Sequence, residues 1–272
     1  ACPYCNARKD TISSQSSVLN YSMFLALPDF VKRRNIIICD EASELENEIV
    51  QRFSSIINYA MLNKMGVTAD RLRSVKSEYV RTWIFNLAGK VDTKLQKLTK
   101  RYKGNVAEAF KYKLRKLTTI KNSLESVYRH WDDCEYVVEK TETGVTLTPL
   151  KVDRLAQCIF DHAEKIILMS ATIVDHKLFA KSLGIKKYKF INVESVFKPE
   201  QSPIYVSTKY KLNYKNLQRT LPYVCKQVEA LLNEHKDVKG VIHTHSFNIT
   251  NQFKNHFRKS KHFKRFLFRE DG

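Results

Sequence analysis

Two short apolar runs in this chain have the pattern of buried β-strands. Residues 35–39 and 165–169 are both rich in isoleucine, and each run is continuous rather than alternating. Continuous β-branched runs are typical of strands buried on both faces of a parallel sheet. We therefore expect the two runs to lie next to each other as parallel strands.

The segment between these runs, residues 44–132, is dominated by helical periodicity. Its apolar residues recur at three- and four-residue spacing, as one face of a helix requires. The repeating positions are Ile49, Phe53, Ile56 and Ile57, then Val80, Trp83, Ile84, Leu87 and Val91, then Val106, Phe110, Leu114 and Leu117. We expect a group of helices here, with Trp83 and Trp131 as packing residues.

The rest of the chain mixes both patterns. Alternation predicts a hairpin of residues 136–139 and 144–148. Helices are expected at 153–163, at 175–183 before Gly184, and at 217–234. Short strands are expected at 204–206 and 240–244, and a strand or turn at 17–22 before a helix that begins within 23–27.

These elements predict an α/β fold in which a helical insertion interrupts a parallel sheet. Residues 1–43 and 133–185 are expected to form the first sheet domain, and residues 44–132 the insertion. Residues 186–272 are expected to form part of a second domain.

The chain is strongly basic, with 47 Lys and Arg against 28 Asp and Glu and a net charge of +19. Residues 61–129 carry 17 of the basic residues and only five acidic ones. Such an excess indicates a polyanionic partner, most commonly nucleic acid. An acidic membrane surface, or a merely solvated face, would give the same composition.

The six cysteines are scattered apart from Cys2 and Cys5, which indicates a reducing compartment. Cys39, Cys158 and Cys225 are expected to be inert buried thiols. No apolar run approaches the roughly 20 residues of a membrane span, and no signal peptide opens the sequence. We expect an intracellular segment of a longer protein, from cytoplasm, nucleoid or nucleus, or from a virus acting in the host cytoplasm.

The residues that follow the two apolar runs carry the candidate chemistry. Asp40–Glu41 follow the first run, and a carboxylate at a strand tip can hold Mg²⁺ while the next one polarises a water molecule. Ser170-Ala171-Thr172 follow the second run. Taken singly, the acids could be only a helix N-terminus, and the hydroxyl residues only an N-cap.

In order and context these features resemble the XPD/DinG-type branch of superfamily 2 DNA helicases, an iron–sulfur helicase family. Residues 36–43 resemble motif II, 168–173 resemble motif III, and 145–150 the segment that leads into it. Residues 240–247 resemble motif IV, and 2–8 and 18–25 resemble the end of the iron–sulfur segment and the stretch after it. The helical block occupies the position of that family's arch insertion.

The resemblance implies RecA-like motor domains and ATP-dependent unwinding of DNA, 5′ to 3′, by a monomer that binds single-stranded and fork DNA and no membrane. It implies ATP, Mg²⁺ and a [4Fe–4S] cluster as cofactors. The implied roles are Asp40 (magnesium), Glu41 (water activation), Ser43, Ser170 and Thr172 (coupling), Cys2 (cluster ligand), and Arg8, Asn20, Tyr21, His245 and Ser246 (DNA contacts).

The sequence departs from the family at several points. Ser43 replaces the usual His of motif II. A phosphate-binding Gly-Lys-Thr/Ser loop, the motifs that follow motif IV and three further cluster cysteines do not occur in these residues. Lysine, metal and arginine act together in phosphoryl transfer, so we expect these 272 residues alone to hydrolyse essentially no ATP and to hold no cluster.

Two other functions fit parts of the sequence. A non-catalytic nucleic-acid-binding module would explain the charge but not the two matched strand ends. Cys2-Pro3-Tyr4-Cys5 also matches the active-site motif of thiol–disulfide oxidoreductases. That reading lacks the preceding strand and the compact fold which such enzymes need. His243 and His245 are expected to be strand-end or DNA-contacting residues rather than metal ligands.

Overall fold

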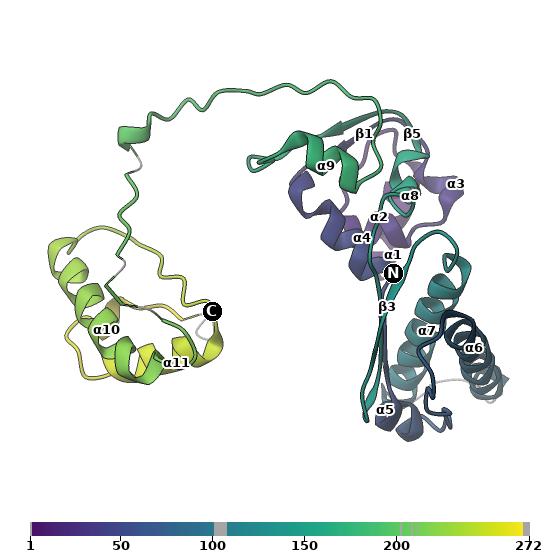
Figure 1. The fold of residues 1–272 in the computed structure, drawn as a ribbon. Helices are drawn as coiled ribbons and strands as arrows, with labels where there is room; N and C mark the ends of the chain where they lie inside the picture. The colour runs from purple at the N-terminus through teal and green to yellow at the C-terminus, as the bar shows by residue number, and fades with distance from the viewer. Residues whose placement is uncertain (1, 101–107, 202, 208, 211, 269–272) are drawn as a thin grey trace. The chain divides into compact units, whose positions relative to one another are not determined.

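The computed structural model describes residues 2–100, 108–201, 203–207, 209–210 and 212–268 of the chain. It is a mixed α/β protein that divides into two compact units, Ala1–Ile191 and Asn192–Gly272 (Figure 1). None of the described helices is both long and apolar enough to cross a membrane.

The first unit contains the expected parallel strand pair. β1 (Arg34–Cys39) pairs with β5 (Ala163–Leu168), with Ile37 opposite Ile166 and Cys39 opposite Leu168. The expectation that β1 is buried on both faces is wrong. Ile36 and Ile38 are 51% and 61% exposed, because no other described element covers that face of the pair.

The opposite face of this strand pair packs on helices. Residues of α2 (Tyr21–Ala26), α4 (Leu45–Phe53), α8 (Gln157–Phe160), α9 (His176–Ser182) and the 3₁₀ turn η1 (Ala42–Glu44) share a core with Cys39 of β1 and Leu168 of β5. The other helices of this part are α1 (Pro3–Ser13) and α3 (Asp29–Lys32). Leu45 and Ile49 of α4 share one fully buried core with Ile159 and Leu183. Because η1 and α4 follow β1 closely in the chain and are anchored in this core, the core also holds the carboxyl end of β1 in place.

Local capping explains where α9 begins and ends. Asp175 begins α9 by accepting hydrogen bonds from the backbone N–H groups of Lys177 and Leu178, and Gly184 ends it at φ +69°, as the sequence predicted.

Two other expectations for this part of the chain need correction. Residues 17–20 form no strand, and α2 begins at Tyr21. The helix expected at 153–163 is reduced to turns and the short α8.

The insertion is built on two long helices, α6 (Ser77–Lys100) and α7 (Glu108–Arg129), with the short α5 (Tyr59–Lys64). The predicted apolar face of α6 is correct, since Val80, Trp83, Ile84, Leu87 and Val91 are all buried. On α7, Leu117 is buried and Leu114 partly buried. Val106, expected on the same face, lies outside the described residues.

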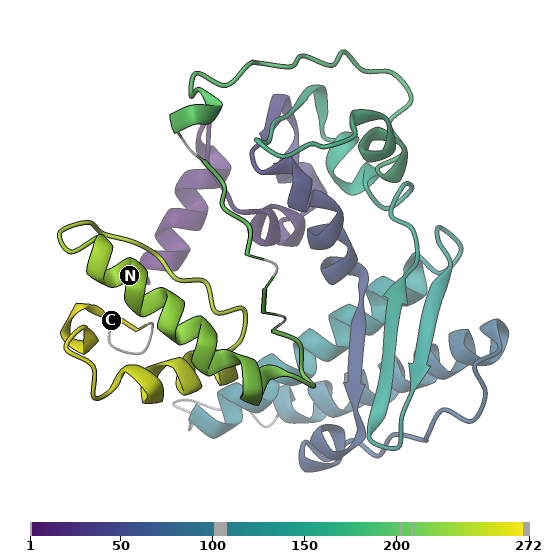
Figure 2. The same ribbon diagram turned by 60° about the vertical axis from the view of Figure 1, so that its left-hand side comes forward.

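A three-stranded antiparallel sheet lies along these helices (Figures 1 and 2). Its order is β2 (Ser55–Asn58), β4 (Gly144–Pro149) and β3 (Tyr136–Lys140), so the predicted hairpin is confirmed. The assignment of Ile56 and Ile57 to a helix is wrong. Both residues lie in β2 and pair with β4, which places Ile57 in the core that α6 and α7 share.

The second unit consists of α10 (Leu217–Glu234), α11 (Phe247–Phe257) and the 3₁₀ turns η2 (Pro199–Gln201) and η3 (Phe263–Arg265). Cys225, Phe253 and Phe257 lie at the centre of its small core, and α10 has the predicted bounds. The strands expected at 204–206 and 240–244 do not form. Neither segment pairs with a partner strand among the described residues.

Candidate active site at the ends of β1 and β5

The carboxyl ends of β1 and β5 remain joined beyond the strands themselves. The Met169 amide donates to the carbonyl of Cys39 at 2.9 Å, and the Ala42 amide donates to the carbonyl of Met169 at 2.9 Å. Parallel strands deliver their carboxyl ends to one edge of a sheet, which is where ligands collect in open α/β folds. The two candidate motifs therefore meet at one edge, as the sequence predicted.

Three hydroxyl groups connect the two motifs, and we call them the hydroxyl cluster: Ser43, Ser170 and Thr172. The Ser170 Oγ donates to Ser43 Oγ at 3.0 Å, and Thr172 Oγ1 lies 3.4 Å from the same atom. The Thr172 amide also donates to Ser170 Oγ at 3.3 Å. The Ser43 hydroxyl thus joins the residues after β1 to those after β5 through hydrogen bonds.

The two acids lie beside this cluster and are both exposed. The Asp40 carboxylate accepts the Glu41 amide at 2.9 Å. Glu41 has φ +49° and ψ +43°, a left-handed conformation that costs a non-glycine residue free energy. Neither carboxylate forms a salt bridge with any cation of the described residues, so both remain open to a ligand.

A partly buried tyrosine holds the backbone of this corner in place. The Tyr21 hydroxyl donates to the carbonyl oxygen of Asp40 at 2.6 Å. Burial, together with the neighbouring Cys39 and Asp40, raises the pKa of Tyr21 well above its ordinary value. Burial likewise raises the pKa of the Cys39 thiol. Both groups therefore stay protonated at neutral pH, and Tyr21 remains a hydrogen-bond donor to the residue before the candidate water activator.

The donor set at this edge suits Mg²⁺ better than a transition metal. No three His, Cys, Asp or Glu side chains gather in a metal-binding arrangement anywhere in the described parts of the chain. Mg²⁺ commonly keeps several waters and uses one or two protein carboxylates together with substrate phosphates. Asp40 could hold Mg²⁺ in this way, and the metal would neutralise phosphate charge.

The cysteines that the structure describes do not fit an iron–sulfur cluster. Such a cluster requires four convergent thiolates. Cys2 lies exposed at the start of α1, whereas Cys39 and Cys225 are buried in two different cores. Cys134 and Cys158 pack against the same core as Cys39, but no three His, Cys, Asp or Glu side chains of the described residues gather as metal ligands. The described cysteines therefore show no arrangement that would hold such a cluster.

The residues predicted to contact DNA are spread over several elements. Arg8 is exposed on α1, and Asn20 caps α2 by accepting the Met23 amide at 2.7 Å. In the second unit, His245 is exposed at φ +63°, and Ser246 caps α11 by accepting the Ile249 amide at 3.3 Å. Asn20, Tyr21 and Ser246 thus have structural hydrogen bonds in addition to the predicted roles, which remain predictions.

Comparison of the chain with protein-family models and with curated proteins gives no match. The class that the fold itself defines is a mixed α/β protein with a small parallel strand pair and a helical insertion. Any more specific function has to be argued from the strand-end geometry and from the charge of the insertion.

Proposed function

We propose that this chain is part of an ATP-driven DNA helicase motor of the XPD/DinG type, with β1 and β5 belonging to a RecA-like domain. The observation that carries the proposal is the link from Ser43 to Ser170 and Thr172, directly beside Asp40–Glu41. A nucleotide-hydrolysing motor needs a residue that holds the metal and a residue that positions the attacking water. Asp40 and Glu41 offer both, and the hydroxyl cluster beside them offers the coupling residues that the resemblance implies.

In this proposal each residue has a separate task. Asp40 holds Mg²⁺, and Glu41 accepts a hydrogen bond from the attacking water and orients it for attack. The hydroxyl cluster joins the loop after β1 to the loop after β5, so a movement of one loop changes hydrogen bonds in the other. That connection is a physical route from phosphate release to the segment that follows β5.

The basic insertion supplies the nucleic-acid side of the proposal. Some cations of this region are neutralised, since Arg81 pairs with Asp132 and Lys121 with Asp92. Others have no carboxylate partner in the described residues, among them Lys94, Lys97, Lys113, Arg115 and Lys116. Unpaired cations on a helical surface attract the phosphates of a single strand.

The experiment that tests the motor uses Asp40→Asn in the complete ATPase, meaning a polypeptide that joins this segment to a phosphate-binding loop. We expect DNA-stimulated ATP hydrolysis to fall at least about 100-fold, because the metal loses its protein ligand. Binding of single-stranded DNA should be unchanged. Wild-type hydrolysis by the variant would reject the motor proposal.

A non-catalytic nucleic-acid-binding module is the second candidate, and the unpaired cations on the insertion favour it equally. It predicts the same salt-dependent binding of single strands, with log K falling by about 0.7 per phosphate contacted for each unit of log salt. It predicts no effect of Asp40→Asn on any activity. The ATPase comparison therefore separates the two candidates, and the salt titration alone does not.

A further inference from the structure

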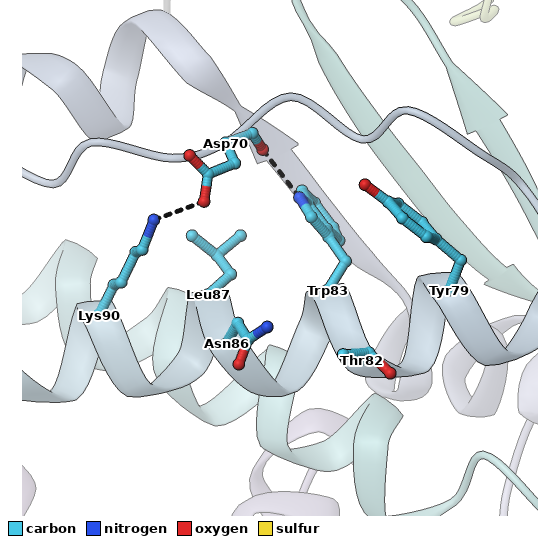
Figure 3. Close-up of a pocket in the computed structure, with 7 residues that line it drawn as sticks. All are labelled: Asp70, Tyr79, Thr82, Trp83, Asn86, Leu87 and Lys90. Atoms are coloured by element: carbon cyan, nitrogen blue, oxygen red, sulfur yellow. Dashed lines mark hydrogen bonds and ion pairs between the residues drawn. The ribbon is translucent and has the colours of Figure 1, made fainter.

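A hollow of about 150 Å³ opens on one face of α6, well away in sequence from the strand ends. Tyr79, Trp83, Leu87 and Lys90 rise from the helix toward the loop that carries Asp70 (Figure 3). Their spacing of three or four residues places them on one face of the helix. The hollow is therefore built by a helix face and a loop, and both walls belong to the insertion.

The walls of the hollow combine an aromatic ring with hydrogen-bonding groups. Tyr79 is 41% exposed, so part of its ring is available to a ligand, whereas Trp83 is only 7% exposed. The Trp83 indole N–H donates to the Asp70 carbonyl at 2.8 Å, which fixes the loop against the helix. Thr82 and Asn86 add an exposed hydroxyl and an exposed amide.

Lys90 lines the hollow, and two more cations lie near the loop that forms its wall. Lys90 pairs with Asp70 at 2.6 Å, and both side chains remain solvent-exposed, so this pair is easily exchanged for another anion. The ammonium of Lys94 lies over Gly66, at the start of the loop. Arg73 is close enough to act on the Asp70 carboxylate. Lys94 and Arg73 have no carboxylate partner among the described residues.

The size and charge of the hollow select its ligand. At about 150 Å³ it is smaller than the roughly 300–1,000 Å³ of pockets for drug-sized ligands, so it suits one flat ring system. The Asp70 carboxylate in its wall would repel the dense negative charge of a triphosphate inside the hollow. An exposed aromatic ring with an amide, flanked by cations, is the chemistry that binds a base and its adjoining phosphates.

We propose that this hollow binds one nucleobase of a single-stranded nucleic acid, stacked on Tyr79 and hydrogen-bonded by Asn86, while Lys90 and Lys94 contact the flanking phosphates. The inference rests on the proposed function only in requiring a single-stranded partner. It does not require the strand ends to be catalytic. The insertion then binds a base of the strand as well as its phosphate backbone.

The test uses the 272-residue chain and its two tryptophans. Trp131→Phe leaves Trp83 as the sole tryptophan and keeps a ring on Tyr136, on which Trp131 stacks at 5.2 Å. Oligothymidylate is titrated against an abasic oligonucleotide of the same length and charge. We expect oligothymidylate to change the Trp83 emission, and the abasic strand to bind more weakly and leave it unchanged.

Matched substitutions on α6 complete the experiment. Tyr79→Ala should weaken oligothymidylate binding about tenfold, and Asn86→Ala should weaken it in the same direction, with little effect on the abasic strand. Tyr79→Phe keeps the ring and should bind like the parent. Phe85→Ala is the control, since Phe85 is 59% exposed on the same helix but does not line the hollow.

The possible outcomes separate this inference from the proposed function. Equal binding of both strands by the parent, Tyr79→Ala and Asn86→Ala would overturn the base pocket and leave a backbone-binding helicase intact. Absence of binding to either strand would overturn both proposals. A loss in Tyr79→Ala and Asn86→Ala that is confined to oligothymidylate supports the pocket, and circular dichroism shows whether each variant is folded.

Discussion

Replacing Ser43 with alanine tests whether the ends of β1 and β5 are physically joined. The variant removes the acceptor of the 3.0 Å bond from Ser170 and the weaker 3.4 Å contact with Thr172. One good hydrogen bond contributes a net 0.5–1.5 kcal/mol, and a contact at 3.4 Å adds little. Because Thr172 is exposed and can bond to water instead, we expect a loss of about 1 kcal/mol.

Thermal unfolding followed by tryptophan fluorescence is the suitable assay. Trp83 and Trp131 both lie in the first unit, so the signal reports that unit alone. For a domain of about 150–250 residues, a loss of 1 kcal/mol lowers Tm by about 2–4 °C. Ser43→Thr retains the hydroxyl, so its Tm should be closer to that of the parent than the Tm of Ser43→Ala is.

A double-mutant cycle isolates the contact itself. Ser43→Ala combined with Ser170→Ala should show a coupling of about 0.5–1 kcal/mol, because the second change removes a bond already lost. Thr119 provides the control, since its exposed hydroxyl donates to the Arg115 carbonyl of its own helix, far in sequence from Ser43 and Ser170. The Ser43 and Thr119 substitutions should add within about 0.5 kcal/mol. Full additivity of Ser43 and Ser170 would refute the joined strand ends.

Two further predictions concern the fold. Gly144→Ala should destabilise the first unit by about 1–3 kcal/mol, because a Cβ there would overlap the Ile57 carbonyl. Gly89→Ala in α6, where a Cβ meets open space, should stabilise the same unit by up to about 1 kcal/mol. Chemical denaturation measures both free energies of unfolding, and similar shifts for the two variants would contradict the reasoning. Burial lowers the pKa of His162 below 6.5, so the folded state favours the neutral ring, and stability should be complete above pH 6.5 and fall as pH drops below it. His162→Asn should flatten this fall, and parallel profiles of parent and variant would exclude His162 as its cause.

The strand pair and its polar ends could be predicted because the physics is local and general. Isoleucine runs favour buried strands, and parallel pairing places their carboxyl ends together. The face of α6 was equally readable from the spacing of Val80 to Val91. In each case the spacing of apolar residues within a single segment determines which face of that strand or helix is apolar.

Other features depend on partners that the sequence does not name. Ile56 and Ile57 fit a helix as well as a strand, and only pairing with β4 decides between them. The strands expected at 204–206 and 240–244 were wrong because a strand needs a neighbour and neither segment has one in the described residues. The spacing that placed Trp83 in the core gave no sign that the loop carrying Asp70 would be hydrogen-bonded to the Trp83 indole.

The most direct measurement of the central claim is ATP turnover by Glu41→Gln in the complete ATPase. The amide keeps the size of the side chain but cannot act as the carboxylate that orients and activates water. We predict that Mg²⁺-ATP and single-stranded DNA still bind, while the rate of hydrolysis in a single turnover falls by about 100-fold or more. Hydrolysis at the parent rate would contradict the assignment of this strand edge as the catalytic centre.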